Sequence, residues 1–272
     1  MDGLLQQKTA IVIGGATGIG EAISKRLAHD GARVIVQGMP EEPVDDVVLE
    51  IRQASGLAES LIGDIAEPEC AQLAVEKCER EFHCLDICVL NPDRIHFTEK
   101  LGEFDCDHFH SILRAIVCSA FYTMHTVLPY LARTKGVMIA VLSRGALDGS
   151  PLAGPYAAGH AAVRAMMMTA AVEYAQEPVR TVNLLLGANH DIFRHSEHAE
   201  GLRETMRAAT PLGRLVSPQE VAAVVSSLSS DNASFLTGTD VVLDGGLSIA
   251  VGQPGEHVHH SVPMTDLRLL HP

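Results

Sequence analysis

An α/β fold, in which a parallel sheet lies between two layers of helices, is predicted by three features of the sequence. Short apolar runs rich in Val and Ile alternate with longer helical stretches along most of the chain, a pattern typical of a parallel sheet covered on both faces. The first run, 9–13, is continuously apolar, as expected for a strand buried on both sides. A glycine-rich turn, 14–20, follows it. Right-handed crossovers between such units would build a doubly wound, Rossmann-type domain.

About seven strands are expected, with helices between them on both faces of the sheet. The expected strands are 9–13, 32–37, 57–63, 85–90, 136–142, 180–186 and 240–243. The expected helices are 21–29, 43–55, 67–82, 107–134, 156–177 and 217–230. We find no internal repeat and no Pro/Ser-rich linker, so one domain is expected over 1–250. The polar segment 188–211 is expected to form a substrate lid, and 251–272 a C-terminal tail.

Composition and charge exclude several classes of protein. The chain has 272 residues, of which 47% are hydrophobic and 20% charged, a balance that excludes a disordered or fibrous protein. No run reaches the ~18 uninterrupted apolar residues of a membrane-spanning helix, and residues 1–8 do not resemble a secretion signal. The formal net charge of −14 opposes binding to nucleic-acid phosphates. We therefore expect a cytoplasmic protein that binds neither nucleic acid nor membrane.

The cysteines and histidines do not indicate a metal site. Six cysteines fall between residues 70 and 118 without a C-x-x-C pair, so buried free thiols are expected. Free thiols fit a reducing compartment. His190, His195 and His198 have no matching Cys or acidic set at ligand spacing, and solvated histidines are the expected outcome.

The glycine-rich turn is the first candidate binding element. Gly14, Gly18 and Gly20 have G-x-x-x-G-x-G spacing between a strand and a helix. Glycine lets the backbone approach a ligand without an intervening Cβ, and the helix N-terminus attracts a pyrophosphate. A purely structural turn also needs glycine, but the strand–turn–helix context favours a nucleotide site.

Further motifs follow in a fixed order. Residues 13–20 read Ile-Gly-Gly-Ala-Thr-Gly-Ile-Gly, and Asp64 follows the third expected strand. The C-terminal motifs are Pro211-Leu212-Gly213-Arg214, 217–222, 236–239 and 242–246. In these motifs the chain resembles the short-chain dehydrogenase/reductase (SDR) family from about residue 5 to 250. The resemblance implies an NAD(P)-dependent oxidoreductase, and in that family Asp64 would meet the adenine ring.

The resemblance also implies the catalytic positions. Ser143, at the end of the fifth expected strand, matches the family's carbonyl-orienting Ser, and Tyr156, thirteen residues later, matches its acid/base Tyr. The family's Lys, four residues after the Tyr, is replaced by His160. Lys is charged at pH 7, whereas an unperturbed His is mostly neutral, so Tyr156 loses a permanent cationic neighbour. His160 either bonds to a ribose hydroxyl or relays a proton, or it fills the slot in an eroded site; the sequence favours neither.

Other departures fall on the nicotinamide side of the implied site. The family's N-N-A-G is Leu90-Asn91-Pro92-Asp93 here, which keeps only the second Asn and adds a carboxylate. A gapless count from 128–129 places the family's helical Asn at Ile116. The family's P-G pair is Gly187-Ala188. The adenine-side motifs are better preserved.

The sequence gives only a weak indication of whether the cofactor is NAD or NADP. Gln37-Gly38 ends the second strand with neither an Asp for a ribose hydroxyl nor an Arg for a 2′-phosphate. Glu41 and Glu42 would repel a phosphate, which weakly favours NAD, and Gln37 or the Gly38 amide is a candidate ribose partner. The residues expected to bind the cofactor are Gly14, Ala16, Thr17, Gly18, Ile19, Gly20, Gly38, Asp64, Ile65, Asn91, Tyr156 and His160.

Two further interpretations concern the surface. The family's subunits pack through the 107–134 and 156–177 helices, so 166–168, three methionines, are expected at the interface of a homodimer or homotetramer. Arg144 offers a positive charge beside Ser143, but a solvent-directed side chain is the simpler expectation.

The leading interpretation is an NAD(P)-dependent oxidoreductase acting on a small alcohol or ketone, with no metal. Tyr156 would be the acid/base, Ser143 would orient the carbonyl, and His160 would be a weaker substitute for Lys. Two alternatives stay open: a nucleotide-binding pseudoenzyme, and a non-redox enzyme of SDR origin that uses Tyr156 for elimination or cyclisation.

Overall fold

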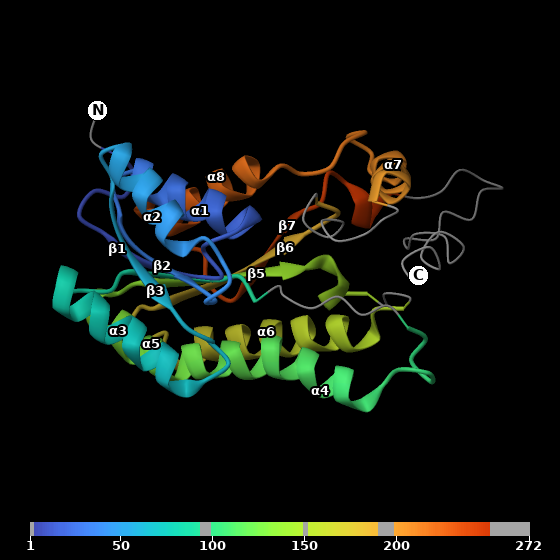
Figure 1. Cartoon of the computed structure of the whole chain (residues 1–272), viewed down its shortest axis with the longest axis horizontal. Helices are drawn as coiled ribbons and strands as arrows, with labels where there is room; N and C mark the ends of the chain where they lie inside the picture. The colour runs from blue at the N-terminus through green and yellow to red at the C-terminus, as the bar shows by residue number, and fades with distance from the viewer. Residues whose placement is uncertain (1–2, 93–98, 149–151, 190–198, 251–272) are drawn as a thin grey trace.

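A seven-stranded parallel sheet lies between two layers of helices (Figure 1). The computed structural model of the protein describes residues 3–92, 99–148, 152–189 and 199–250. The strands are β1 (Thr9–Ile13), β2 (Arg33–Gly38), β3 (Leu57–Ile62), β4 (Ile87–Leu90), β5 (Val137–Ser143), β6 (Arg180–Leu186) and β7 (Thr239–Leu243). Their spatial order is β3-β2-β1-β4-β5-β6-β7, and every neighbouring pair is parallel. The predicted doubly wound, Rossmann-type fold is confirmed.

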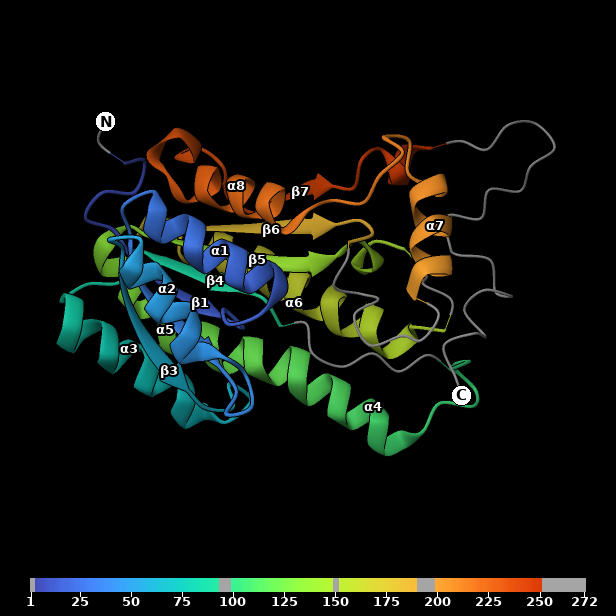
Figure 2. The ribbon, with the colours of Figure 1, turned by 45° about the horizontal axis from the view of Figure 1, so that its top comes forward.

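The helices form one layer on each face of the sheet (Figures 1 and 2). One layer holds α1 (Gly18–His29), α2 (Val44–Gln53) and α8 (Pro218–Ser229). The other holds α3 (Pro68–Phe82), α4 (Cys106–Leu113), α5 (Ser119–Thr134) and α6 (Gly154–Glu173). A further helix, α7 (Ala199–Ala209), lies beyond the carboxyl ends of β5 to β7 in both views.

The pleat of β1 shows why the strands are continuously apolar. Ala10 and Val12 belong to the core cluster beneath α1, α2 and α8. Ile11 and Ile13 belong to the cluster on the opposite face, beneath α3, α5 and α6. All four side chains are at most 2% exposed. Because successive side chains point to opposite faces and both faces are covered, none of these four positions favours a polar residue.

The helix expected over 107–134 is interrupted by a π turn. Arg114–Cys118 forms this turn between α4 and α5. Such turns inside α-helices are frequent at functional sites. By length and composition alone, Cys106–Thr134 is apolar enough to cross a membrane, but Ile112, Ile116 and Leu131 are fully buried in the protein core. The segment is a core helix of this fold.

The polar segment 188–211 contains helix α7, which the sequence did not predict. Ion pairs between residues three apart, Arg203 with Glu200 and Arg207 with Glu204, support this helix. Leu202, Met206 and Ala209 have the spacing of one helix face in the sequence, so a helical pattern was available there. Residues 190–198 of the segment, including His190, His195 and His198, and the expected tail 251–272 lie outside the described residues.

Only three of the six cysteines are buried. Cys70, Cys78 and Cys88 are buried free thiols, and burial raises the pKa of Cys70 to about 11 and that of Cys88 to about 12. Thiols with such pKa values are unreactive near neutral pH. Cys84 and Cys118 are partly exposed and Cys106 is exposed, so the expectation of burial is wrong for these positions.

Candidate active site

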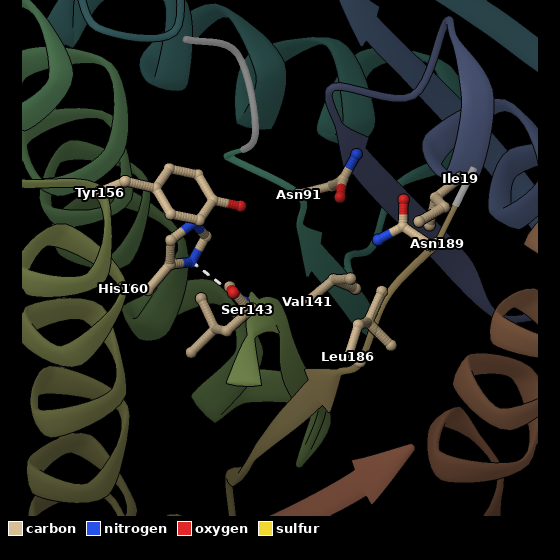
Figure 3. Close-up of a pocket in the computed structure, with 10 residues that line it drawn as sticks. Ile19, Asn91, Val141, Ser143, Tyr156, His160, Leu186 and Asn189 are labelled. Atoms are coloured by element: carbon tan, nitrogen blue, oxygen red, sulfur yellow. Dashed lines mark hydrogen bonds between the residues drawn. The ribbon is translucent and has the colours of Figure 1, made fainter. Parts of the chain in front are cut away.

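A pocket lies at the carboxyl ends of β4, β5 and β6, beside the amino end of α1 (Figure 3). Strand order reverses between β1 and β4, and open α/β sheets bind ligands at such a switch point. The empty space in and above the pocket, including open solvent, is about 300 Å³. Its lining residues are Ile19, Asn91, Val141, Leu142, Ser143, Tyr156, His160, Leu186, Gly187 and Asn189.

The glycine-rich turn presents bare backbone at this edge. Gly14 has φ +67°, and a Cβ there would lie 2.6 Å from the carbonyl oxygen of Asn91. A Cβ on Gly20 would lie 1.8 Å from the carbonyl oxygen of Gly14. Neither position accepts a side chain, so backbone alone forms this wall, next to the positive end of the α1 dipole. Such a cradle fits the pyrophosphate of a dinucleotide.

The other residues expected at the phosphate side surround this turn. Thr17 is the N-cap of α1, and Ile19 lines the pocket. The side-chain amide of Asn91 donates to the carbonyl oxygen of Gly14 over 3.4 Å, which ties the end of β4 to the turn. Ala16 is fully buried, so it shapes the turn and offers a ligand only its backbone.

Gln37 has a structural role that the sequence did not suggest. Its Oε1 accepts from the backbone N–H of Gly14 over 2.9 Å, and its Nε2 donates to the carbonyl oxygen of Gly63 over 2.7 Å. The side chain is 1% exposed. Gln37 therefore holds the glycine-rich turn against the end of β3, and its proposed role as a ribose partner is wrong.

Asp64, the residue expected to meet an adenine ring, lies two residues after β3, and its carboxylate is engaged within the protein. Oδ1 accepts from the N–H of Ala66 over 2.9 Å, and Oδ2 accepts from Arg114 over 3.1 Å. Arg114, from the π turn, also pairs with Glu67, and the hydrogen bond that Arg114 donates to Asp64 raises the pKa of Arg114. The side chain of Ile65 is buried in the core, so only its backbone faces this site.

Ser143, Tyr156 and His160 meet in the pocket although they come from β5 and α6 (Figure 3). Tyr156 and His160 are one helical turn apart on α6, and their rings meet edge to face with centroids 4.3 Å apart. The backbone N–H of Ser143 donates to Nδ1 of His160 over 3.3 Å. A backbone N–H is only a donor, so Nδ1 accepts and the proton of the neutral ring lies on Nε2. His160 is 1% exposed.

The hydroxyl group of Ser143 is oriented by its own turn. Its Oγ accepts from the backbone N–H of Gly145 over 3.1 Å at the start of a short 3₁₀ turn, Arg144–Ala146. An oxygen that accepts in this way keeps its hydrogen for donation to another acceptor. The arrangement therefore presents one O–H donor beside the phenol of Tyr156.

Ile116 lies in the middle of the π turn, fully buried. A Cβ on Gly159 would approach its side chain to 3.2 Å, so the glycine lets α6 pack closely against the π turn. Ile116 stands where the gapless count places the family's helical Asn. Its apolar side chain, in place of an amide, supports the helix that carries His160.

Asn189 is a candidate site residue that the sequence analysis missed. It is 5% exposed, and its side chain points into the pocket opposite Asn91 (Figure 3). A polar residue three positions after the end of β6, at the edge where ligands bind, was the available signal. Gly187 is in the same strand end, where a Cβ would lie 2.8 Å from Asp244. Asp93 lies outside the described residues.

Two surface expectations are corrected. The side chain of Arg144 is only 12% exposed and pairs with Asp148, so it is not directed to solvent. Met167 is fully buried in the core of its own chain and is not available to a subunit interface, whereas Met168 is 38% exposed. Among the described residues, no group of three or more His, Cys, Asp or Glu side chains is placed to hold a metal ion.

Comparison with known proteins matches this architecture. Residues 14–248 match the family model described as enoyl-(acyl carrier protein) reductase. Cyclohexanol dehydrogenase of Acinetobacter sp. (strain SE19) is 31% identical over 247 residues, 90% of this chain and 96% of that protein. L-rhamnose 1-dehydrogenase (NAD(P)(+)) of Sphingomonas sp. (strain SKA58) is 30% identical over 90% of this chain and 98% of that protein. Cis-4-hydroxycyclohexanecarboxylate dehydrogenase of Sinomonas cyclohexanicum is 30% identical over 88% of this chain and 96% of that protein.

The parallel sheet, its glycine-rich turn and the pocket at the switch point define a Rossmann-type α/β protein with a candidate ligand site at the carboxyl edge of the sheet. The chain belongs to the short-chain dehydrogenase/reductase family.

Proposed function

We propose that this protein is an NAD(P)-dependent oxidoreductase that interconverts a small alcohol and the corresponding ketone. The observation that carries the proposal is the convergence of Ser143, Tyr156 and His160 in one pocket beside the glycine-rich turn. The cofactor, when bound, supplies or accepts the hydride at the substrate carbon. The chain supplies the proton and the geometry.

Tyr156 is the proposed acid/base. In the reducing direction its phenol gives a proton to the carbonyl oxygen as that oxygen gains charge; in the oxidising direction the phenolate takes the proton of the alcohol. A side chain suited to this task must lie within hydrogen-bond reach of the substrate oxygen. Tyr156 lines the pocket, and its oxygen points toward the pocket interior (Figure 3).

Ser143 is the proposed orienting group. Its hydroxyl is held by Gly145 N–H and donates to the same substrate oxygen, which polarises the carbonyl and restricts its position. Donors aimed at the oxygen where charge develops lower the barrier of such reactions.

His160 positions the site in this proposal. It connects the ring of Tyr156 to the backbone of Ser143, and its Nε2–H is the proposed link to a ribose hydroxyl or to a proton relay. Because the ring is neutral in this tautomer, Tyr156 receives less electrostatic support than a Lys would provide.

The cofactor would lie along the carboxyl edge of the sheet. Its pyrophosphate would rest on the cradle of Gly14, Gly18 and Gly20, and its adenine would lie near Asp64. The apolar side chains of Ile19, Val141 and Leu186 suit an uncharged substrate, in agreement with the relative that is named for cyclohexanol. The segment 188–211 is the proposed substrate lid over a single domain, 1–250.

The protein is further proposed to be a cytoplasmic homo-oligomer, a dimer or a tetramer. Phe121 on α5 and Val172 on α6 are 51% and 79% exposed, which supports an interface on this layer of helices. Sedimentation of the purified protein would give the number of subunits.

The test of the proposed activity combines binding with turnover. Calorimetry with NADH and NADPH should show binding, and cyclic and linear secondary alcohols with their ketones should change the nicotinamide absorbance. Binding without turnover across this panel would favour a nucleotide-binding or non-redox protein, which the replacement of Lys by His160 also allows. Failure of both nucleotides to bind would refute the proposed activity.

A further inference from the structure

Strand β3 forms one edge of the sheet, with β2 as its neighbour. Alternate residues of an edge strand direct their backbone N–H and C=O groups toward the neighbouring strand, and the others direct them away. The N–H of Gly63 donates to the carbonyl oxygen of Gly38, in β2, over 3.0 Å, so the odd-numbered residues of this strand face β2. Ala58, Ser60 and Ile62 therefore direct their backbone groups away from the sheet.

Two cationic side chains take outward carbonyl oxygens of β3. Nε of Arg52, near the end of α2, donates to the carbonyl oxygen of Ala58 over 2.9 Å. Nζ of Lys77, in α3, donates to the carbonyl oxygen of Ser60 over 2.6 Å. Because α2 and α3 belong to opposite layers of helices (Figure 1), the two side chains reach the edge of the sheet from both of its faces.

Glu59 lies between the two capped residues and connects the cations. Its carboxylate accepts from Nη2 of Arg52, and its Oε2 lies 3.7 Å from Nζ of Lys77. Arg52, Glu59 and Lys77 thus form a continuous ion-pair network over the edge, which we call the edge cap. An incoming strand would have to displace both cations before its own N–H groups could reach these carbonyl oxygens.

The side chains of β3 explain why its edge needs protection. Leu57 and Ile62, at the two ends of the strand, are 59% and 49% exposed. An edge strand that presents apolar side chains and unpaired backbone groups is a template for pairing with another chain. Charged side chains placed over the edge, Lys in particular, are a common means of preventing such pairing.

We infer that the edge cap closes β3 against pairing with the β3 strand of a second copy of this chain. Two such strands, antiparallel about a two-fold axis, would otherwise join two sheets into one. The inference does not depend on the proposed activity or on a bound cofactor. It restricts the proposed homo-oligomer to other surfaces of the fold.

The test is sedimentation of the full chain with the edge cap removed by Arg52→Met, Glu59→Gln and Lys77→Met. Met keeps a flexible, unbranched side chain without a donor, and Gln avoids an unpaired carboxylate at the edge. This triple variant should reach about twice the wild-type mass at the same protein concentration, because strands that pair about a two-fold axis form a closed pair. The substitutions make the net charge of −14 more negative, so general charge repulsion would oppose this association.

The matched control is Lys25→Met, Arg80→Met and Glu81→Gln. Lys25 pairs with Glu21 and Glu50, and Arg80 pairs with Glu81, so these cations cover no strand carbonyl oxygen in the part of the chain that the structure describes. The control has the same change in residue types and charge, and it should keep the wild-type mass.

Ser60→Pro, added to the triple variant, tests whether the association is strand pairing. The N–H of Ser60 points away from β2, so its loss leaves the sheet intact but removes a donor that an added strand needs. The quadruple variant should return to the wild-type mass. A mass increase that persists with Pro at this position, or an equal increase in the control, would contradict strand pairing at β3.

Circular dichroism of the triple variant shows whether it folds. A folded triple variant that keeps the wild-type mass would overturn the inference. If the triple variant does not fold, Lys77→Met alone uncovers the carbonyl oxygen of Ser60, and its mass should also increase with concentration. An unchanged mass of the folded single variant would then overturn the inference.

Discussion

The backbone N–H of Ser143 donates a hydrogen bond to Nδ1 of His160, over 3.3 Å. This bond joins the last residue of β5 to the second turn of α6 and fixes the plane of the imidazole against the ring of Tyr156. At the position where the family resemblance implies a Lys, this chain therefore has an imidazole whose Nδ1 accepts from the backbone of another element. Position 160 orients its neighbours and adds no fixed charge.

Replacing His160 with Lys is expected to raise the rate of hydride transfer at pH 7 by about tenfold or more. A permanent positive charge one turn from Tyr156 stabilises the phenolate that forms during alcohol oxidation, and about 1.4 kcal/mol of added stabilisation is a tenfold change in rate. The measurement is kcat/KM with the alcohol selected from the panel.

The control for this change is His160→Gln. The amide oxygen still accepts from the N–H of Ser143, but the side chain carries no charge, so no rise is expected. A rise of equal size in both variants would show that charge at position 160 is not the cause.

Tyr156→Phe is expected to lower kcat by about 10² to 10⁴, the range found when a positioned acid/base is removed. NADH affinity should change by less than about tenfold, or 1.4 kcal/mol, because the ring and its contact with His160 remain. Tyr174→Phe, the same chemical change at the C-terminal end of α6, should leave kcat unchanged. Full turnover by the Tyr156→Phe variant would remove the phenol from the chemistry.

Gly20→Ala is expected to destabilise the fold by about 1–3 kcal/mol, since overpacking a tight contact costs this much. The added Cβ would overlap the carbonyl oxygen of Gly14 at 1.8 Å, so the turn must open and nucleotide affinity must fall. Gly201→Ala in α7 has no atom within 4 Å of the new Cβ and should stabilise that helix by up to about 1 kcal/mol. Urea unfolding of both variants is the measurement, and equal effects would contradict the close contact at Gly20.

Asp30 is expected to make the protein sensitive to acid. Burial acts to raise its pKa, but hydrogen bonds from Ser226 and Arg26 outweigh burial and lower the pKa below the usual 3.8. A carboxyl whose folded pKa is depressed stabilises the fold above its unfolded pKa, and this stabilisation is lost as pH falls through the folded value. The contribution should therefore be complete above about pH 5 and be lost progressively below about pH 4.

The variant that tests this contribution is Asp30→Asn, which removes the charge between α1 and α8. Its free energy of unfolding should be about 1–3 kcal/mol lower than that of the wild type at pH 7, the usual worth of hydrogen bonds to a charged group. The difference in the free energy of unfolding between variant and wild type should become smaller as the pH falls toward about 3. A gap that stays constant over this range would mean that the charge of Asp30 is not responsible.

Local sequence patterns were enough to predict much of this architecture. The β-branched runs and the glycine-rich turn indicated the seven parallel strands, because apolar periodicity and backbone sterics act within a few residues. The turn at Gly14 and Gly20 followed from the same local rules. Resemblance to the family then marked Ser143 and Tyr156, and the pocket brings them together. Helix α7 was missed although Leu202 and Met206 have helical spacing, because the polar segment around them was expected to be a lid.

The sequence by itself thus determined the sheet, the phosphate-side turn and the candidate residues of the pocket. Only the tertiary structure decided what Gln37, Glu42, Arg144 and His160 do, since each depends on partners brought close by packing. Gln37 bridges Gly14 and Gly63, which are 23 and 26 residues away. The carboxylate of Glu42 accepts a hydrogen bond from the backbone N–H of Met39. Nδ1 of His160 accepts a hydrogen bond from the backbone N–H of Ser143, on β5. Such hydrogen bonds depend on distances and angles that are set only in the folded chain. The spacing of residues along the sequence therefore does not predict them.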